Sequence, residues 1–203
     1  ITGLPPVEKG RIFIDEMDTT DFDERLYNEH IRPRMAIVFQ RGALWDSMSV
    51  SENIDLVIRM REDSSEEDRR ERVEESLRMV ELREAGDKLP KELSGGMIKR
   101  AAIARAIATR PHYLIYDEPT TGLDPVLAGM TNTLIRDLNE QLGVTAIVIS
   151  HDVRHLADFS DRVIMLKDGV VAADVPASEL WSAENPVLSR FVRGEQIEKR
   201  MAE

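Results

Sequence analysis

Three short apolar segments constrain the fold of this chain more than any other feature. They cover residues 35–39, 113–116 and 144–149, and each is rich in β-branched or other large apolar side chains. Residues 97–109 and 125–142 show helical patterns, the first ending before a proline and the second before a glycine. Strands that alternate with helices are typical of a mostly parallel sheet covered by helices, so we predict an α/β fold.

Polar side chains follow each of the three predicted strands. Gln40 comes after the first, Asp117 and Glu118 come after the second, and His151 comes after the third. Open α/β sheets bind their ligands beyond the carboxyl ends of the strands. We therefore expect these side chains to share one site, although a lone glutamine or histidine after a strand is more often structural.

A serine and two glycines stand directly before a predicted helix. Ser94, Gly95 and Gly96 can present backbone amides and a helix dipole to a phosphate. Asp117 and Glu118 can hold a magnesium ion and orient a water molecule. Together the two motifs predict nucleotide hydrolysis. Taken alone, a Ser-Gly-Gly sequence more often only caps a helix, and two acids before a proline turn can simply be solvated.

Length and composition narrow the function classes. The 203 residues suit one domain with a sizeable core. The formal net charge of −11 argues against a broad nucleic-acid-binding surface, so no nucleic-acid partner is expected. The lack of cysteine excludes disulfides and thiolate metal sites. No apolar run approaches the ~20 residues that span a bilayer, so any membrane role must come through a partner.

Residues 50–93 differ in character from the segments around them, because they are mainly polar and charged. The serines and glutamates at 64–67 offer a capping box for a helix. Val73, Leu77 and Val80 then supply an apolar stripe at helical spacing. These patterns predict an inserted helical subdomain.

Five motifs in order resemble those of the ATP-binding-cassette (ABC) ATPases, which have a P-loop NTPase-like fold. Residues 93–96 are similar to the signature loop, and residues 113–119 are similar to the Walker B strand. Three further segments resemble the Q-loop glutamine, the D-loop and the switch histidine: Gln40, residues 122–125 and residues 150–152. The match covers most of the chain, from Ile1 to about Gly169.

The resemblance implies that some of these residues face a second protomer. Ser94, Gly95 and Gly96 would hold the γ-phosphate of an ATP molecule bound by the opposite protomer, and glycine would allow its close approach. Asp124 would act across the same interface; the alternative for it is a turn-forming Asp-Pro. A homodimer that encloses two ATP molecules is therefore expected.

The resemblance also implies roles at the metal and at the attacking water. Asp117 would hold Mg²⁺ largely through the water shell of the ion, and Gln40 would reach the metal or that water with its amide oxygen. Glu118 would polarise the water, and His151 would contact the γ-phosphate. Glu118 and His151 are thus the expected catalytic residues, with ATP and Mg²⁺ as the cofactors.

These implications lead us to expect a single ABC ATPase domain over 1–203. Residues 1–40 and 97–175 would form a RecA-like core with a mostly parallel sheet. Residues 41–96 would form the helical subdomain, with the signature loop at its end. Residues 176–203 would form a C-terminal helical tail.

The chain departs from the family pattern in two places. It contains no Gly-x-x-x-x-Gly-Lys-[Ser/Thr] phosphate loop, although residues 1–4 look like the sequence that normally follows one. We therefore expect a complete ATPase of which this sequence is an N-terminally truncated part, inactive by itself. Second, Met97 stands where most signature loops carry glutamine.

Three segments resemble most closely the ATPases of the maintenance-of-lipid-asymmetry (Mla, MCE-associated) lipid transporters: Met97, residues 39–48 and residues 185–192. The resemblance implies ATP hydrolysis that powers the transport of phospholipid or a related lipid. Membrane permease subunits and an MCE-type lipid-binding protein would be partners, and the ATPase would lie on the cytoplasmic, inner face of the inner membrane. The permease would dock near residues 41–48, where an apolar side chain such as Trp45 can equally belong to a local core.

Two alternatives of other classes stay open at this point. One is a soluble ABC ATPase that acts in DNA repair or translation, which a second cassette upstream would favour. The other is a non-catalytic protein that donates only its signature loop, which a true start at Ile1 would favour.

Overall fold

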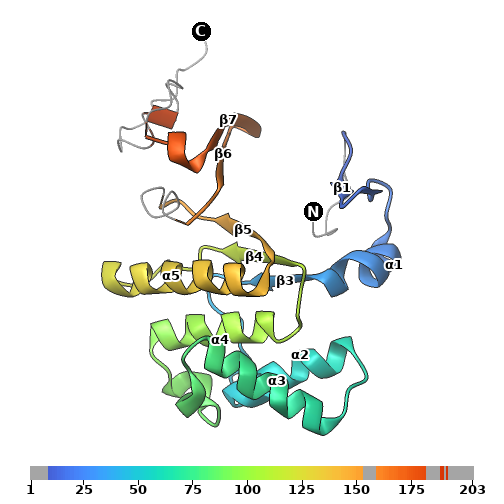
Figure 1. Ribbon diagram of the computed structural model, residues 1–203, viewed down its shortest axis with the longest axis vertical. Helices are drawn as coiled ribbons and strands as arrows, with labels where there is room; N and C mark the ends of the chain where they lie inside the picture. Colours follow the sequence, from blue (N-terminus) through green and yellow to red (C-terminus); the bar gives the residue numbers. More distant parts are fainter. Residues whose placement is uncertain (1–8, 153–158, 182–187, 190, 192–203) are drawn as a thin grey trace. The chain divides into compact units, whose positions relative to one another are not determined.

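A computed structural model describes residues 9–152, 159–181, 188, 189 and 191 (Figure 1). The chain divides into two compact units, Ile1–Ile149 and Ser150–Glu203, which are described separately below.

The centre of the first unit is a three-stranded parallel sheet. Its strands lie in the order β3 (Met35–Val38), β4 (Tyr113–Asp117) and β5 (Thr145–Ile149). They coincide with the three apolar segments of the sequence, so the predicted α/β fold with a parallel sheet is confirmed. Leu114 and Tyr116 of β4 are fully buried, as expected for the middle strand.

One helix of the first unit directly precedes β4 along the chain, and another connects β4 to β5. Helix α4 (Gly95–Ile107) connects towards β4, and its alanine-rich middle is buried, as a helix with small side chains can be when it packs closely on a sheet. Helix α5 (Pro125–Leu142) begins with proline at its first position. It ends at Gly143, which adopts the left-handed backbone with φ +62° that closes many helices.

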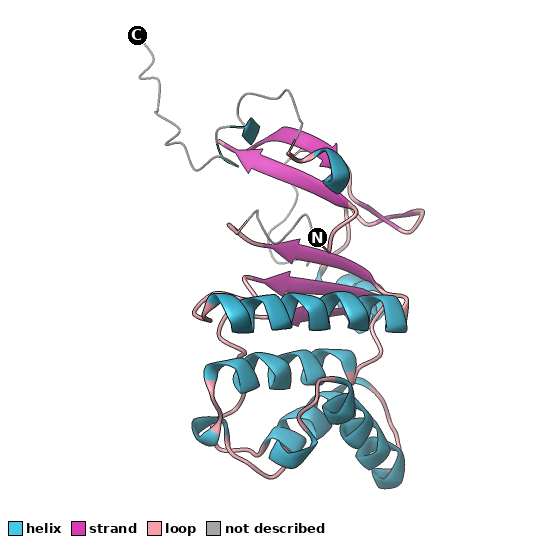
Figure 2. Cartoon of the chain, turned by 60° about the vertical axis from the view of Figure 1, so that its left-hand side comes forward, coloured by secondary structure: helices cyan, strands magenta, loops and turns pink. Residues whose placement is uncertain are grey.

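The segment predicted to be a helical subdomain contains the helices α2 (Val50–Arg61) and α3 (Glu66–Met79). Two 3₁₀ turns, Arg83–Ala85 and Pro90–Glu92, lead from α3 to α4. Helices α2, α3 and α4 pack against one another, and α4 also packs on β3, so α4 lies between the sheet and the helical pair (Figure 2). The division into core and subdomain at residues 41 and 96 stays a prediction.

The start of α3 differs in detail from the sequence prediction. Ser65 caps the helix by accepting a hydrogen bond from the Asp68 backbone N–H at 3.1 Å. Residues 64–67 do not form the predicted reciprocal capping box. The start of α2 has one. There the Ser49 backbone N–H donates to the Glu52 carboxylate at 2.7 Å, and the Ser49 hydroxyl accepts from the Glu52 N–H.

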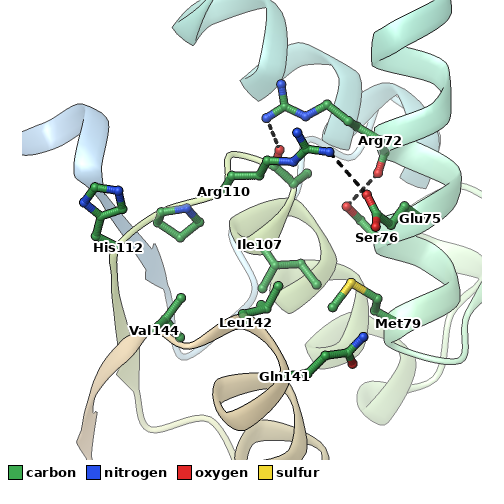
Figure 3. A pocket seen from close by; sticks show the side chains of 12 residues that line it. Arg72, Glu75, Ser76, Met79, Ile107, Arg110, His112, Gln141, Leu142 and Val144 are labelled. Atoms are coloured by element: carbon green, nitrogen blue, oxygen red, sulfur yellow. Dashed lines mark hydrogen bonds and ion pairs between the residues drawn. The ribbon is translucent and has the colours of Figure 1, made fainter.

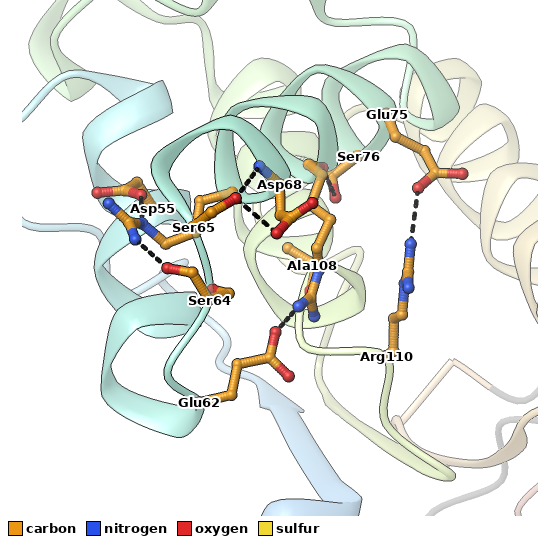
Figure 4. A network of polar contacts seen from close by, with 11 residues as sticks. Asp55, Glu62, Ser64, Ser65, Asp68, Glu75, Ser76, Ala108 and Arg110 are labelled. Carbon is orange, nitrogen blue, oxygen red and sulfur yellow. Dashed lines mark hydrogen bonds and ion pairs between the residues drawn. The ribbon is translucent and has the colours of Figure 1, made fainter.

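Arginine side chains connect the helices around α3 (Figure 4). Arg69 donates to the Asp55 carboxylate of α2 at 2.8 Å. Arg72 donates to the Ala108 carbonyl just beyond α4 at 2.6 Å and forms an ion pair with Glu62. The helices are therefore joined by polar contacts as well as by apolar packing.

A small subassembly precedes β3. Strands β1 (Phe13–Ile14) and β2 (Met17–Asp18) form an antiparallel hairpin. Helix α1 (Glu24–Leu26) continues into a π-helical turn, Tyr27–Ile31, and a 3₁₀ turn, Arg32–Arg34, that leads into β3. Its apolar cluster is made by the following buried side chains: Ile14, Tyr27, Ile31 and Met35.

The second unit contains an antiparallel pair, β6 (Arg162–Lys167) and β7 (Val170–Pro176), followed by a 3₁₀ turn, Ala177–Glu179. Asp168 and Gly169 both have positive φ, which makes the tight turn between the strands. The predicted helical tail over 176–203 lies largely outside the described residues. In the part of the chain that the structure describes, no helix combines the length and the apolar character needed to cross a membrane.

Candidate active site

The strand register brings most of the predicted polar residues to one end of the sheet. Val38 pairs with Tyr116, so the segment carrying Gln40 and the segment carrying Glu118 leave the sheet side by side. Asp117 is the last residue of β4 and pairs with Ile149 of β5. The carboxyl ends of parallel strands therefore meet where the sequence predicts a site.

Glu118 is fixed by its backbone and by its carboxylate. Its φ of +49° lies in the left-handed region, which is unfavourable for a residue with a side chain. Its N–H donates to the Ile149 carbonyl at 2.9 Å, and its Oε2 accepts a hydrogen bond from the Thr121 hydroxyl at 2.8 Å. The half-buried carboxylate thus has a defined direction at the end of β4.

A buried lysine lies between the two loops of the site. The Lys99 ammonium, on α4, donates to the backbone carbonyl of Gln40 and, at 3.3 Å, to the backbone carbonyl of Glu118. Lys99 is only 6% exposed. Burial lowers the pKa of its ammonium, and the negative charges of Glu118 and Asp117 partly oppose that shift.

The segment after Gln40 is packed on the same helix. Arg105 of α4 donates to the Gly42 carbonyl at 3.0 Å and also to the Ala43 carbonyl. Gly42 has φ +77°, and a Cβ there would lie 2.9 Å from Cγ2 of Ile98. A side chain at this position would be strained by the positive φ and would displace the Ile98 side chain, so glycine allows the loop to pack closely on α4.

The Ser-Gly-Gly motif forms the amino end of α4. Ser94 is the N-cap, and its hydroxyl oxygen accepts from the Met97 N–H at 3.3 Å. Gly95 and Gly96 are the first two helical residues, whose N–H groups have no partner within a helix. A Cβ at either glycine would approach other side chains no closer than 3.8 Å, an ordinary contact. Packing within the described part of the chain therefore does not require glycine at these positions.

Two further predicted site residues, Asp124 and His151, do not directly follow β3 or β4. The Asp124 carboxylate caps α5 by accepting from the backbone N–H groups of Val126 and Leu127, both at 3.0 Å. Its structural role as a cap is thus observed, while its role across a dimer stays a prediction. His151 lies two residues after β5, in the second unit, so its predicted place beside Glu118 also stays a prediction.

The residues present suit magnesium better than a metal held by protein alone. In the described ranges, no group of three or more histidine, aspartate or glutamate side chains could hold a metal ion. Mg²⁺ usually binds through one or two carboxylates, with phosphate oxygens and water completing its shell. Asp117, half-buried at the end of β4, supplies one such carboxylate.

Lys99 and Thr121 are site residues that the sequence reasoning missed. Lys99 has a detectable signal, because it occupies the same helical face as the buried Ala102, Ile103 and Ala106. A cation that stays buried on an apolar stripe requires a buried partner. Thr121 has no comparable signal, since a threonine before a glycine is typical of a turn.

A cavity lies elsewhere, at the amino ends of β4 and β5 (Figure 3). Its volume is about 430 Å³. Side chains from α3, the carboxyl ends of α4 and α5 and the adjoining loops line it, among them Arg72, Glu75, His112 and Leu142. None of the predicted site residues lines this cavity, so it is distinct from the candidate active site.

Comparison with known proteins gives a consistent set of matches. A family model described as ABC transporter matches residues 1–121. The intermembrane phospholipid transport system ATP-binding protein MlaF of Haemophilus influenzae is 38% identical over 93% of this chain and 71% of its own length. MlaF of Escherichia coli K12 is 39% identical over 84% of this chain, which spans 62% of that relative. The Fe(3+) ions import ATP-binding protein FbpC of Mannheimia succiniciproducens is 33% identical, over 96% of this chain and 54% of its own.

Solved structures of ATP-binding cassettes are also similar. A dimeric, post-hydrolysis structure of the cassette MJ0796 bound to ADP and Pi has a TM-score of 0.76 and 34% identity, covering 87% of this chain and 77% of that one. CbiO1 from Clostridium perfringens, part of the ABC transporter complex cbiONQ, has a TM-score of 0.83 and 28% identity, covering 95% and 76%.

Proposed function

This chain belongs to the ABC transporter family of ATPases, and we propose that its protein is the ATP-hydrolysing subunit of a transporter for phospholipid or a related lipid. The MlaF relatives, named for phospholipid transport, are 38% and 39% identical to it. The FbpC relative, named for Fe(3+) import, is 33% identical. The higher identity and Met97 in the signature loop favour a lipid over a metal ion as the cargo.

The anchoring of Glu118 is the observation that carries the hydrolytic part of the proposal. Its carboxylate is oriented by Thr121, and its backbone is held at the end of β4 by Ile149. A carboxylate fixed in this way, next to Asp117, is suited to accept a proton from a water molecule that attacks a phosphate. A group that is already oriented needs little rearrangement during the reaction.

The amino end of α4 is suited to bind a phosphate that is carried by another chain. Ser94 and Gly95 are exposed, and α4 has 13 residues. The backbone N–H groups of its first turn point outward along the helix axis, where they can bind a phosphate. Since internal packing does not require Gly95 and Gly96, a closely approaching phosphate is a physical reason for both glycines. We assign that phosphate to an ATP molecule held by a second protomer, with Asp124 at the same interface.

The remaining roles concern the metal and the γ-phosphate. Mg²⁺, when bound, would neutralise phosphate charge during transfer. Asp117 and the side chain of Gln40 would hold it at the carboxyl end of the sheet. His151 would donate to the γ-phosphate and help to fix the attacking water.

The loop after Gln40 provides a surface for a permease subunit. Trp45 is 60% exposed, whereas Leu44 and Met48 are half-buried. An exposed tryptophan on a loop held by α4 suits contact with a membrane partner. The ATPase would then act as a homodimer on the cytoplasmic face of the inner membrane, beneath permease subunits and with an MCE-type lipid-binding protein.

Steady-state phosphate release by the full-length protein tests the hydrolytic proposal. Glu118→Gln keeps the shape of the side chain but removes the proton acceptor, so turnover should fall by roughly 10²-fold or more while ATP binding persists. Glu140→Gln, at an exposed position of α5, is the matched control and should keep wild-type turnover. Unchanged turnover in Glu118→Gln would exclude Glu118 as the residue that activates water.

A further inference from the structure

We propose that Lys99 is a positioning residue for ATP hydrolysis, which ties Glu118 and the loop after Gln40 to the helix that carries Ser94, Gly95 and Gly96. This inference rests on the proposed function, because it concerns how the catalytic carboxylate is placed. Lys99 has no role in the motifs that identified the site.

The partners of the Lys99 ammonium distinguish it from the other cations of the first unit that donate to backbone carbonyls. A buried ammonium loses hydration, which is costly unless its N–H groups find acceptors. Lys99 finds two, and both are backbone carbonyls of residues at the candidate active site, Gln40 and Glu118. Hydrogen bonds to an ionised donor are stronger than neutral ones, so this pair of contacts can hold both loops.

The contact at Glu118 acts on the direction of its side chain. The left-handed backbone of Glu118 has an energetic cost of about 1–3 kcal/mol, so it persists only where the surroundings hold it. The Ile149 carbonyl binds the peptide group before the residue, and Lys99 binds the carbonyl after it. With both flanking peptides held, the Cα–Cβ bond has a fixed direction, and the carboxylate can be oriented by Thr121.

Helix α4 links this contact to the Ser-Gly-Gly motif. Lys99 lies about one helical turn after Gly95, so the two move as one rigid element. Arg105, further along α4, holds the carbonyl of Gly42 at 3.0 Å. A displacement at the amino end of α4 is thus passed directly to the backbone of Glu118 and to the loop after Gln40.

The kinetic test uses the full-length protein with Lys99→Met and Lys99→Arg. Methionine keeps an unbranched chain but has no donor, so kcat should fall by about ten-fold or more while the KM for ATP stays within about two-fold. Arginine keeps a cationic donor and should restore kcat to within about three-fold of wild type. If Lys99 only filled space, Lys99→Met would keep the wild-type kcat.

Arg100→Met is the matched control on the same helix. Arg100 also donates to a backbone carbonyl, but to that of Val80 at 3.0 Å, and to Glu81, away from the site. Its loss should leave kcat within about two-fold of wild type. Because a Met variant can fail to fold, Lys99→Gln is measured in parallel; its shorter amide cannot span both carbonyls, and it should show the same loss of kcat.

The outcomes separate this inference from the proposed function. If the wild-type protein releases phosphate and Glu118→Gln does not, the hydrolytic assignment stands independently of Lys99. In that case, wild-type kcat in folded Lys99→Met or Lys99→Gln would overturn the positioning role. Equal losses in Lys99→Arg and Lys99→Met would overturn it too, because the donor would not be what matters.

Discussion

Glu118 combines an unfavourable backbone with contacts from three separate segments. Its φ is +49°, and the residue precedes Pro119, which further restricts its backbone. The contacts come from Ile149 on β5, Lys99 on α4 and Thr121 in the following turn. Strain that is held by surrounding structure is common at functional sites, and here it falls on the residue predicted to activate water.

The Thr121 hydroxyl should matter for the rate of hydrolysis. Thr121→Val removes the donor at 2.8 Å from Oε2 of Glu118 while keeping the volume of the side chain. We expect kcat to fall by about ten-fold, a barrier change of about 1.4 kcal/mol, with little change in KM. Steady-state kinetics check this, with Thr121→Ser as the variant that keeps the hydroxyl. Equal rates in wild type and Thr121→Val would show that this hydrogen bond does not orient the carboxylate.

The sequence allows part of this site to be predicted, for a specific reason. Gln40, Asp117 and Glu118 follow recognisable strands, and the geometry of a parallel sheet brings such residues together. The contacts that orient Glu118 could not be predicted in the same way, because Lys99 reaches it across 19 residues of sequence. That contact depends on how α4 packs.

At the level of elements, the loop before α2 is organised by one buried side chain. Asn53 is 0% exposed, and its amide oxygen accepts from the Trp45 N–H at 2.7 Å. Its amide nitrogen donates to three carbonyls, those of Trp45, Met48 and Ser49, at 3.1, 3.1 and 2.9 Å. A buried side chain of α2 therefore fixes the backbone of the proposed permease-binding surface around Trp45.

Replacing Asn53 should destabilise the protein. Asn53→Ala leaves several buried backbone groups without partners, and we expect a loss of about 2–4 kcal/mol in the free energy of unfolding. Asn53→Asp should be at least as harmful, because a carboxylate would face the three carbonyls that the amide now binds. Denaturant unfolding measures both changes. A loss below about 1 kcal/mol in either variant would contradict the account of this loop.

The parallel strands and the helices α3, α4 and α5 of the first unit follow from patterns in the sequence, whereas strand β2, helix α1 and the hairpin of the second unit were missed. Helix α5 has clear end signals in Pro125 and Gly143, and the parallel strands are mainly apolar. Strand β6 alternates between exposed and half-buried residues, and β7 alternates only in its second part, which is a weaker pattern than a continuous apolar strand. The Asp168-Gly169 pair between them is nevertheless a strong hairpin signal.

At the scale of the whole molecule, an apolar surface adjoins the amino end of α4. Val126 and Met130 of α5 are 72% and 49% exposed, and Leu127 lies within contact distance of where a Cβ on Gly96 would be. Exposed apolar side chains beside the proposed phosphate-binding end of α4 suit an interface that closes over ATP. This agrees with the proposed homodimer.

A bulky charge in that interface should prevent its closure. Ser94→Arg places a guanidinium at the exposed amino end of α4, where we propose that the second protomer presents its γ-phosphate. In a Glu118→Gln background, ATP should produce a dimer with Ser94 but no dimer with Ser94→Arg. Ser94→Ala loses only the helix cap, a cost of about 1 kcal/mol, and should still dimerise. Sedimentation with and without ATP decides, and a dimer of Ser94→Arg would exclude the motif from the interface.

The central claim is that ATP hydrolysis by this protein drives lipid transport, and transport in a reconstituted membrane tests it most directly. The full-length protein and its permease subunits would be placed in vesicles containing a fluorescent phospholipid, with ATP and Mg²⁺ supplied on the ATPase side. We predict transfer of the phospholipid that requires ATP and is lost in Glu118→Gln. ATP hydrolysis without lipid transfer, or with transfer of Fe(3+) instead, would contradict the account.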